Sequence, residues 1–411
     1  MSSENPHVFV IGAGAAGLTA AIFAAENGAK VTLLERTDKA GKKILMSGGT
    51  RCNVLPVEME LTDYVTSSSD KKMRNIFRSW NLEACKEWFE KDIGLRLACE
   101  KETNKWFPVS NSAKEVRNLL LAKALRVGVD IKYECAVDQI TQIENGFEIR
   151  TKSGAIFQAE KVIVSTGGYS IPSIGTDGMG HRFMKKIGHQ TDPVYAALTP
   201  LAGSDRKHHA LSGLSLNVSL EVWQENKKRA SSNRSGFLFT HRGYSGPAVL
   251  DVSHYAVKAL ESGEKMPEFR VNWSGEPREI WEQRLSSGKM IVLNLLKEHL
   301  PNRLAEWLAE ELGISSVRVA EIKKNDRKKL LQYLTAYPLP IDGHEGYKKA
   351  EVTGGGIPLE EIHTATLESA FIPQLYLCGE ILDVFGRIGG FNFYWAWLTG
   401  RLAGISAAKK S

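Results

Sequence analysis

The sequence predicts an α/β protein of two parts, a domain built on a parallel sheet and a second domain inserted into it. Three observations point to this fold class. Strand, glycine-turn and helix patterns follow one another within the first 35 residues. Alternating patterns fill the middle of the chain, and helical periodicity replaces them from about residue 277. At 411 residues the chain is also longer than one hydrophobic core usually serves.

Composition excludes several classes of protein. With 43% hydrophobic and 24% charged residues, the chain is neither disordered nor fibrous. Its 53 Lys and Arg against 47 Asp and Glu leave a net charge of +6, which averaged over the chain is too dilute to indicate a nucleic-acid partner. No apolar run reaches the ~20 residues that a membrane span needs. We therefore expect a small-molecule substrate, no nucleic acid, no membrane, and a monomer or homodimer.

Cysteine and histidine usage argues against metals and disulfides. The five cysteines form no CxxC pair, and His208-His209 has no further ligand at metal-binding spacing. We expect no metal site, and a reducing cytoplasm fits this cysteine usage best.

The first 35 residues have the pattern of a dinucleotide-binding βαβ unit. Residues 7–11 are a short buried-strand pattern that leads into the glycine turn 12–17, and a helical pattern follows. A second strand over 30–34 ends at Glu35, 23 residues after Gly12. Because strand, turn, helix and acidic residue are all in register, we interpret the glycines as a cofactor site and not as a structural turn.

Each position of this unit has a physical role. Gly12 allows the tight turn, Gly14 lets a pyrophosphate approach the backbone, and Gly17 lets helix and strand pack closely. The helix start supplies N–H groups and a positive dipole end to the phosphates. Glu35 would accept hydrogen bonds from an adenosine ribose, which favours FAD or NAD over NADP. The further contacts that we expect here come from Ala15, Ala16 and Arg36.

Two more glycine-rich segments favour FAD, the longer ligand. After Glu35 comes a glycine-rich basic loop whose expected cofactor contacts are Gly41, Lys42, Lys43, Ser47, Gly48, Gly49, Arg51, Cys52 and Asn53. Near the other end, a strand pattern leads to Gly379-Glu380, and an apolar helix starts at Gly389-Gly390-Phe391-Asn392. Two such sites at opposite ends of the chain suit FAD, with adenine near the first and flavin near the last. Backbone N–H groups at this helix start would then stabilise negative charge on the reduced ring.

At these residues the sequence resembles the BaiN/YhiN-like, or aminoacetone-oxidase-type, FAD-binding flavoproteins of the two-dinucleotide-binding-domain superfamily. The resemblance covers nearly the whole chain and rests on short motifs in one order, including residues 12–17, 47–53, 107–110, 165–168, 238–241, 245–247, 353–356 and 379–383. It implies non-covalently bound FAD in a Rossmann-like domain of glutathione-reductase type, interrupted by a β-barrel-like insertion with a small helical subdomain. It also implies cofactor contacts from Val137 at the adenine and from Thr166, Gly167 and Gly168. Asp383 would bond a ribityl hydroxyl or cap its loop.

The expected domain boundaries follow the change of pattern along the chain. We expect the FAD-binding domain at 1–195 and 346–411 and the inserted substrate or cap domain at 196–345. Within the insertion, 196–275 should be β-rich and about 277–334 helical.

Three side chains are candidates for chemistry beyond the flavin. Cys52, beside Arg51, could be a redox thiol, but with no partner cysteine nearby in sequence a packing role is favoured. His241 is a candidate general acid with an even alternative as a loop-shaping residue. Tyr244 is a weaker proton-donor candidate that is more often structural.

The first functional hypothesis is an FAD-dependent oxidoreductase that passes hydride from NAD(P)H to a small activated C=C bond. No second glycine fingerprint follows a strand, so NAD(P)H would be a transient co-substrate. The alternatives are an O2-dependent oxidase of a small amine or alcohol, and a flavin-dependent RNA-modifying protein, against which the near-neutral charge argues.

Overall fold

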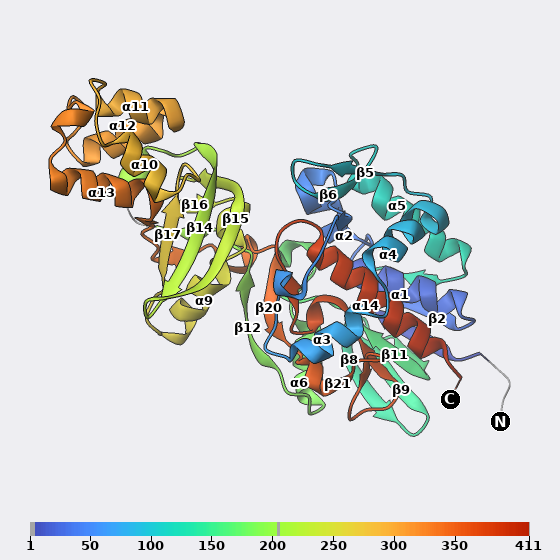
Figure 1. The fold of residues 1–411 in the computed structure, drawn as a ribbon. Coiled ribbons are helices and arrows are strands. Elements are labelled where there is room, and N and C mark those ends of the chain that lie inside the picture. Colours follow the sequence, from blue (N-terminus) through green and yellow to red (C-terminus); the bar gives the residue numbers. More distant parts are fainter. Residues whose placement is uncertain (1–4, 204–205, 411) are drawn as a thin grey trace. The chain divides into compact units, whose positions relative to one another are not determined.

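The computed structural model describes residues 5–203 and 206–410 and divides into two compact units (Figure 1). Unit 1 comprises Met1–Tyr195 and Glu351–Ser411, and unit 2 comprises Ala196–Ala350. Each unit has its own hydrophobic core. These boundaries lie at 195/196 and 350/351, against the expected 195/196 and 345/346.

The centre of unit 1 is a seven-stranded sheet with the order β21-β22-β23-β11-β1-β2-β7. Its five strands from β7 to β23 are parallel, and β22 and β21 add to one edge antiparallel. The bounds are β1 His7–Ile11, β2 Lys30–Leu34, β7 Asp130–Lys132, β11 Lys161–Val164, β21 Ile362–His363, β22 Glu368–Ser369 and β23 Leu375–Leu377. A parallel sheet whose strands are almost entirely buried is typical of a Rossmann-like domain.

Two helices from opposite ends of the chain pack side by side in unit 1 (Figure 1), α1 (Ala15–Glu26) and α14 (Phe391–Ala408). Glycine makes this close packing possible. A Cβ at Gly400 would overlap the carbonyl oxygen of Ala16, and one at Gly404 would overlap that of Ala20. The glycines therefore fix the start of α14 relative to the glycine turn that precedes α1.

The remaining elements of unit 1 surround this centre. An antiparallel meander consists of β8 (Val137–Ile143), β9 (Gly146–Thr151) and β10 (Ile156–Ala159). The smaller strands are β3 Leu55–Pro56, β4 Tyr64–Val65, β5 Leu97–Glu100, β6 Lys105–Pro108, β20 Val352–Gly356 and β24 Phe385–Gly386, with β12 Asp192–Ala197 crossing into unit 2. The helices are α2 Lys42–Met46, α3 Asp70–Phe77, α4 Leu82–Trp88, α5 Ala113–Arg126 and α6 Met179–Lys186.

Unit 2 combines one antiparallel sheet with helices. The strand order is β18-β17-β14-β15-β16-β13-β19. The strands are β13 Leu201–Ala202, β14 Ser215–Gln224, β15 Lys227–Phe239, β16 Gly243–Ser245, β17 Glu268–Asn272, β18 Tyr337–Pro338 and β19 Gly343–His344. The helices are α7 Arg206–His209, α8 Pro247–Leu250, α9 Ser253–Ser262, α10 Arg278–Arg284, α11 Val292–His299, α12 Asn302–Glu311 and α13 Lys324–Thr335.

Two segments differ from what their sequence patterns indicate. Residues 131–133 alternate like the strands of the meander, but Ile131 pairs with Leu33, so β7 extends the parallel sheet instead. The expected β-rich part of the insertion also contains α8 and α9, whose apolar residues Val249, Ala256 and Val257 are fully buried. Among the described residues, no helix is long and apolar enough to span a membrane, and no three His, Cys, Asp or Glu side chains cluster as a metal site.

Candidate functional site

The glycine turn between β1 and α1 has one open position and two crowded ones. Gly12 has φ +101°, and a Cβ there would lie 2.8 Å from the carbonyl oxygen of Ser165. A Cβ on Gly17 would overlap the carbonyl oxygen of Gly12. In contrast, a Cβ on Gly14 would meet nothing within 4 Å. Gly12 and Gly17 are therefore required by the fold itself, whereas the space beside Gly14 is free for a ligand.

Glu35 is tied to the glycine turn by its own carboxylate. One oxygen accepts from the backbone N–H of Ala13 at 2.9 Å, and the other accepts from the N–H and hydroxyl of Thr37 at 2.8 and 2.7 Å. A carboxylate offers about four acceptor positions, so capacity remains for a ribose hydroxyl. The expected neighbour Arg36 forms an ion pair with Asp177 at 2.8 Å instead of standing free.

The basic loop after β2 folds back onto the same turn. Gly41 has φ +69°, caps α2 and donates its N–H to the carbonyl of Ala13 at 2.8 Å. Beyond α2, left-handed backbone recurs at Gly48, Gly49, Thr50 and Cys52. Thr50 and Cys52 adopt this conformation at a steric cost that glycine would not have, and such strain is often found at binding sites.

The side chains of Arg51 and Cys52 point to structural roles. Arg51 pairs with Glu100 at 2.9 Å, and its guanidinium lies 4.0 Å from the ring centre of Phe107. Cys52 is fully buried, and burial raises the pKa of its thiol to about 12. A thiol that stays protonated at neutral pH is a poor nucleophile. The structure therefore favours the packing role of Cys52 over the catalytic one.

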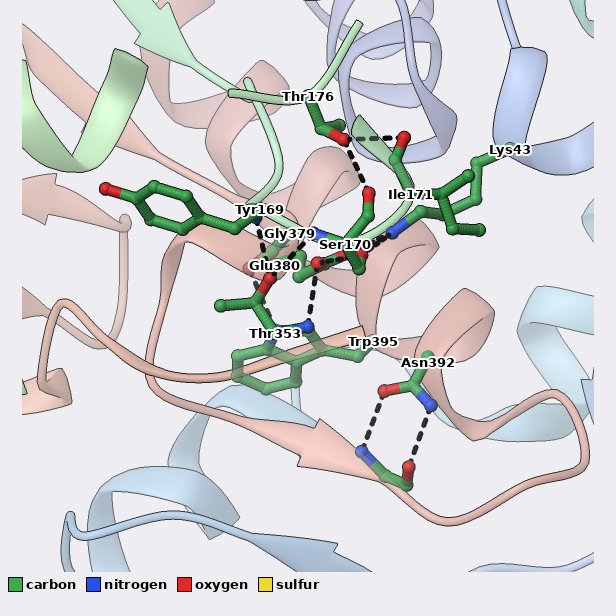
Figure 2. A network of polar contacts seen from close by, with 11 residues as sticks. Lys43, Tyr169, Ser170, Ile171, Thr176, Thr353, Gly379, Glu380, Asn392 and Trp395 are labelled. Atoms are coloured by element: carbon green, nitrogen blue, oxygen red, sulfur yellow. Dashed lines mark hydrogen bonds and ion pairs between the residues drawn. The ribbon is translucent and has the colours of Figure 1, made fainter. Parts of the chain in front are cut away.

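A polar network joins four segments that are distant in sequence (Figure 2). The ammonium of Lys43 contacts Glu380 at 2.6 Å and the Ser170 hydroxyl at 2.7 Å. The other carboxylate oxygen of Glu380 accepts from the Ser170 hydroxyl at 3.0 Å and from the Thr353 N–H at 2.9 Å. The Thr353 hydroxyl oxygen in turn accepts from the N–H of Tyr169 at 2.7 Å.

This network fixes the segments that surround the expected flavin site. Only 17% of the Glu380 side chain and 27% of the Lys43 side chain are exposed. Desolvation opposes ionisation of Glu380, yet the Lys43 ammonium and the hydrogen bonds from Ser170 and Thr353 hold its pKa below the ordinary value. The indole N–H of Trp395 donates to the carbonyl of Gly379 at 3.2 Å, which joins α14 to the same network (Figure 2). Lys43 and Glu380 were expected to contact the cofactor, but in the structure their side chains form an ion pair with each other.

The start of α14 is held in place on both sides. Gly389 and Gly390 have φ +128° and +95°, and a Cβ on Gly390 would lie 2.7 Å from the backbone carbon of Leu55. The amide of Asn392 exchanges two hydrogen bonds with the backbone of Gly386, at 2.8 and 2.7 Å (Figure 2). The Asn392 side chain is therefore used within the fold, and the backbone N–H groups of the first turn remain as donors for a ligand.

Asp383 caps a neighbouring loop. It is 3% exposed and accepts from the N–H and the hydroxyl of Ser67 at 2.7 and 2.6 Å. Of the two expected roles, the structure shows the loop cap.

Several buried polar atoms in unit 1 lack a protein partner. Within the described residues, this holds for the side-chain oxygens of Asn53 and Thr166. Such groups are costly unless water or a ligand satisfies them. Asn53 follows the strained loop, and Thr166 follows β11. Together with the open space at Gly14, these atoms fit FAD, which would pair with polar groups along its length.

His181 is a buried residue that the sequence did not single out. It is 3% exposed, stacks on Tyr169 with 5.5 Å between ring centres, and has a pKa lowered to about 4 by burial. Ser170 and Thr353 were also missed as network members. Thr353 lies in the motif 353–356, on which the family resemblance partly rests. Nothing in the sequence indicated that its hydroxyl would accept hydrogen bonds from the backbone N–H groups of residues 169 and 170.

The two candidate proton donors of unit 2 differ in their exposure to solvent. His241 is exposed in the turn between β15 and β16. Tyr244 is fully buried, and its hydroxyl lies 2.6 Å from Nδ1 of His208 in the core of unit 2. Because a buried hydroxyl bonded to a core histidine is poorly placed to meet a substrate, Tyr244 fits the structural role.

The residues expected to contact adenine (Val137) and to form the loop after β11 (Gly167 and Gly168) would contact the cofactor through their backbone atoms. Val137 begins β8, is 5% exposed, and pairs with Thr151 in the meander. Gly167 has φ +68°, and a Cβ on Gly168 would overlap the Thr353 hydroxyl. Cofactor contact by these residues stays a prediction.

The chain is similar to known proteins over nearly its whole length. The family model described as "HI0933-like protein Rossmann domain" matches residues 6–406. The chain is 32% identical to the ribosomal RNA dihydrouridine synthase of Haemophilus influenzae, covering 99% of each chain. It is also 32% identical to the Escherichia coli protein of the same name, covering 96% of each. A 3-dehydro-bile acid delta(4,6)-reductase of Clostridium scindens is 30% identical, with 98% of each chain covered.

Proposed function

Because this chain belongs to the HI0933-like family, a family of FAD-dependent oxidoreductases, we propose that it reduces a carbon–carbon double bond conjugated to a carbonyl group. Support comes from what the named reactions of the relatives share. A dihydrouridine synthase saturates the ring double bond of uracil, and a delta(4,6)-reductase of a 3-dehydro substrate saturates ring double bonds conjugated to its ketone. In both, hydride must reach a carbon that is electrophilic through conjugation with a carbonyl group, and a proton must reach the neighbouring carbon of the same double bond.

The chain's own residues would position the cofactor for this reaction. Bound FAD supplies a hydride donor and acceptor at N5 of its ring. The free space at Gly14 and the N-terminal N–H groups of α1 would hold the pyrophosphate. Glu35 would hold the ribose, and the first turn of α14 would stabilise negative charge at the pyrimidine end of the ring. The Lys43–Glu380 network would keep the loops around the ring fixed.

NAD(P)H is the proposed source of hydride. Since no second glycine fingerprint follows a strand in the sequence, the nicotinamide cofactor would bind only in passing. His241 is the proposed proton donor to the substrate, because imidazole exchanges protons near neutral pH and this side chain is exposed.

Anaerobic stopped-flow spectroscopy tests the proposal. The purified holoprotein is mixed with NADH or NADPH, and bleaching of the flavin is followed. The reduced protein is then mixed with a cyclic enone or with a uridine-containing RNA. We expect reduction by a nicotinamide cofactor and reoxidation by an acceptor of this type. Failure of NADH and NADPH, combined with reduction by an amine or alcohol, would replace the proposal by an O2-dependent oxidase.

A further inference from the structure

Unit 2 carries a cluster of exposed, positively charged side chains around the start of α13. The segment 288–291 lies beside the segment 317–320, because Val319 donates its N–H to Met290 at 2.9 Å and Ala320 donates to Gly288 at 3.2 Å. The second segment continues directly into α13. We call the exposed cations of these segments the α13 basic surface: Lys289, Arg318, Lys323, Lys324, Lys328 and Lys329.

This surface has a high local density of positive charge. Residues 288–291 and 317–329 contain seven Lys and Arg against Glu321 and Asp326, a net charge of +5 in 17 residues. Concentrated charge of this kind creates a local positive potential that the average over the chain conceals.

The cations of this surface are unpaired, unlike others in the same unit. Arg270 pairs with Glu268 at 2.6 Å, and Lys297 pairs with Glu306 at 2.6 Å. In the described part of the chain, no carboxylate forms an ion pair with any member of the α13 basic surface. These side chains keep their charge available for a partner.

The position of the cations on the helix also argues against a stabilising role. Lys323 is the N-cap of α13 and Lys324 is its first residue. The N-terminal end of a helix dipole is positive, so lysines there destabilise the helix. The buried face of α13, Leu330, Leu331 and Leu334, holds it on the core regardless of these lysines. The lysines are thus better explained by a polyanionic partner than by folding.

We propose that the α13 basic surface docks the phosphate backbone of an RNA. The proposal rests on the proposed function to the extent that the RNA would carry the C=C bond, as in the two relatives named ribosomal RNA dihydrouridine synthase. RNA binding itself is measured without turnover, so it fails or succeeds separately from the redox chemistry. It departs from the expectation, drawn from the average charge, that no nucleic acid binds.

The test compares a triple variant with a matched control. The variant Lys323→Gln/Lys324→Gln/Lys328→Gln removes three charges while keeping helix-forming side chains. The control Lys71→Gln/Lys152→Gln/Lys185→Gln removes three exposed lysines of unit 1 that have no ion pair in the described chain. Binding of a fluorescent 20-nucleotide single-stranded RNA and of protein-free ribosomal RNA is measured between 50 and 200 mM salt.

The salt dependence gives the expected magnitude. Each phosphate contact to single-stranded RNA contributes about −0.7 to the slope of log K against log salt. Losing three contacts should reduce the magnitude of this slope by about 2. Over the fourfold salt range, the factor by which wild-type affinity falls should therefore be roughly 20 times the factor by which variant affinity falls. The control should keep the wild-type slope. Flavin content and flavin reduction by NAD(P)H should stay unchanged in both proteins.

An unchanged slope in the triple variant would overturn the proposal, as would an equal loss in the control. Binding of the wild-type protein to vesicles of anionic lipid but not to RNA would also overturn it and assign the surface to a membrane. A protein that binds RNA through α13 yet reduces no C=C bond would leave the docking surface intact and refute the proposed function alone.

Discussion

Glu380→Gln should destabilise the protein substantially, because it removes the charge that the partly buried Lys43 ammonium requires. The amide keeps the shape of the carboxylate and can still accept from Thr353, so hydrogen-bond geometry changes little. Removing one partner of a buried ion pair costs about 3–5 kcal/mol. Since 27% of Lys43 is exposed, water partly compensates, and we expect about 3 kcal/mol. For a domain of this size that corresponds to a fall in Tm of roughly 6 °C.

The effect should also depend on pH. The folded-state pKa of Glu380 lies below the ordinary value of 4.5, so the folded protein binds fewer protons at this site than the unfolded chain. The stability that the carboxylate contributes is fully present above pH 4.5 and is lost as the pH falls through the folded-state pKa. Glutamine does not titrate. The stability difference between wild type and variant should therefore shrink as the pH falls below about 4.5 and approaches the folded-state pKa.

Calorimetry and denaturant unfolding of both proteins across this pH range provide the assay. Glu87→Gln is the control, because the Glu87–Lys91 pair is exposed, at 52% and 72%, and exposed pairs contribute below about 1 kcal/mol. A loss in Glu380→Gln no larger than in the control, or a difference that does not shrink as the pH falls below 4.5, would refute the role assigned to this ion pair.

Four further predictions concern the cofactor and the proton donor. Gly14→Val should fold normally but purify without FAD, measured as flavin per chain, because its side chain would fill the space left open for the pyrophosphate; full flavin content would relocate the phosphates. Glu35→Ala should weaken FAD binding by roughly 1.5–3 kcal/mol in a fluorescence titration, and an unaltered Kd would place the ribose contact elsewhere. Cys52→Ser should keep anaerobic flavin reduction within a few-fold, since a thiol with a pKa of about 12 is protonated throughout the assay; loss of reduction would revive a thiol mechanism. His241→Ala should leave flavin reduction intact and slow substrate turnover by roughly 10²–10⁴-fold, whereas undiminished turnover would make the histidine structural.

The parts of the fold that follow from neighbouring residues could be predicted from the sequence. The expected strands at 7–11 and 30–34 coincide with β1 and β2, and α1 follows the glycine turn as expected. Local chemistry decides these elements: a buried run, glycines where the backbone needs them, and a helix start. The family match over residues 6–406 confirms the Rossmann domain that this unit predicted.

Contacts between distant segments could not be predicted in this way. Lys43 and Glu380 are 337 residues apart, and Lys43 and Ser170 are 127 apart. In the sequence, Lys43 and Glu380 each lie next to glycines. Taken separately, each was therefore interpreted as a cofactor contact. Only the folded chain shows that this partly buried lysine and this partly buried glutamate form an ion pair. Tyr244 is a similar case: a structural role was favoured from the sequence, but its partner His208, 36 residues away, could be identified only in the folded chain.

Net charge shows why an average over the chain can mislead. A value of +6 spread over 411 residues would give a weak field everywhere, and on that basis a nucleic-acid partner was not expected. Electrostatic attraction falls off within about 8 Å at physiological salt, so a phosphate responds only to the charges close to it. At the α13 basic surface those charges are unpaired cations, and charges beyond that distance contribute little. The distribution of charge, and not its total, therefore determines whether RNA can bind there.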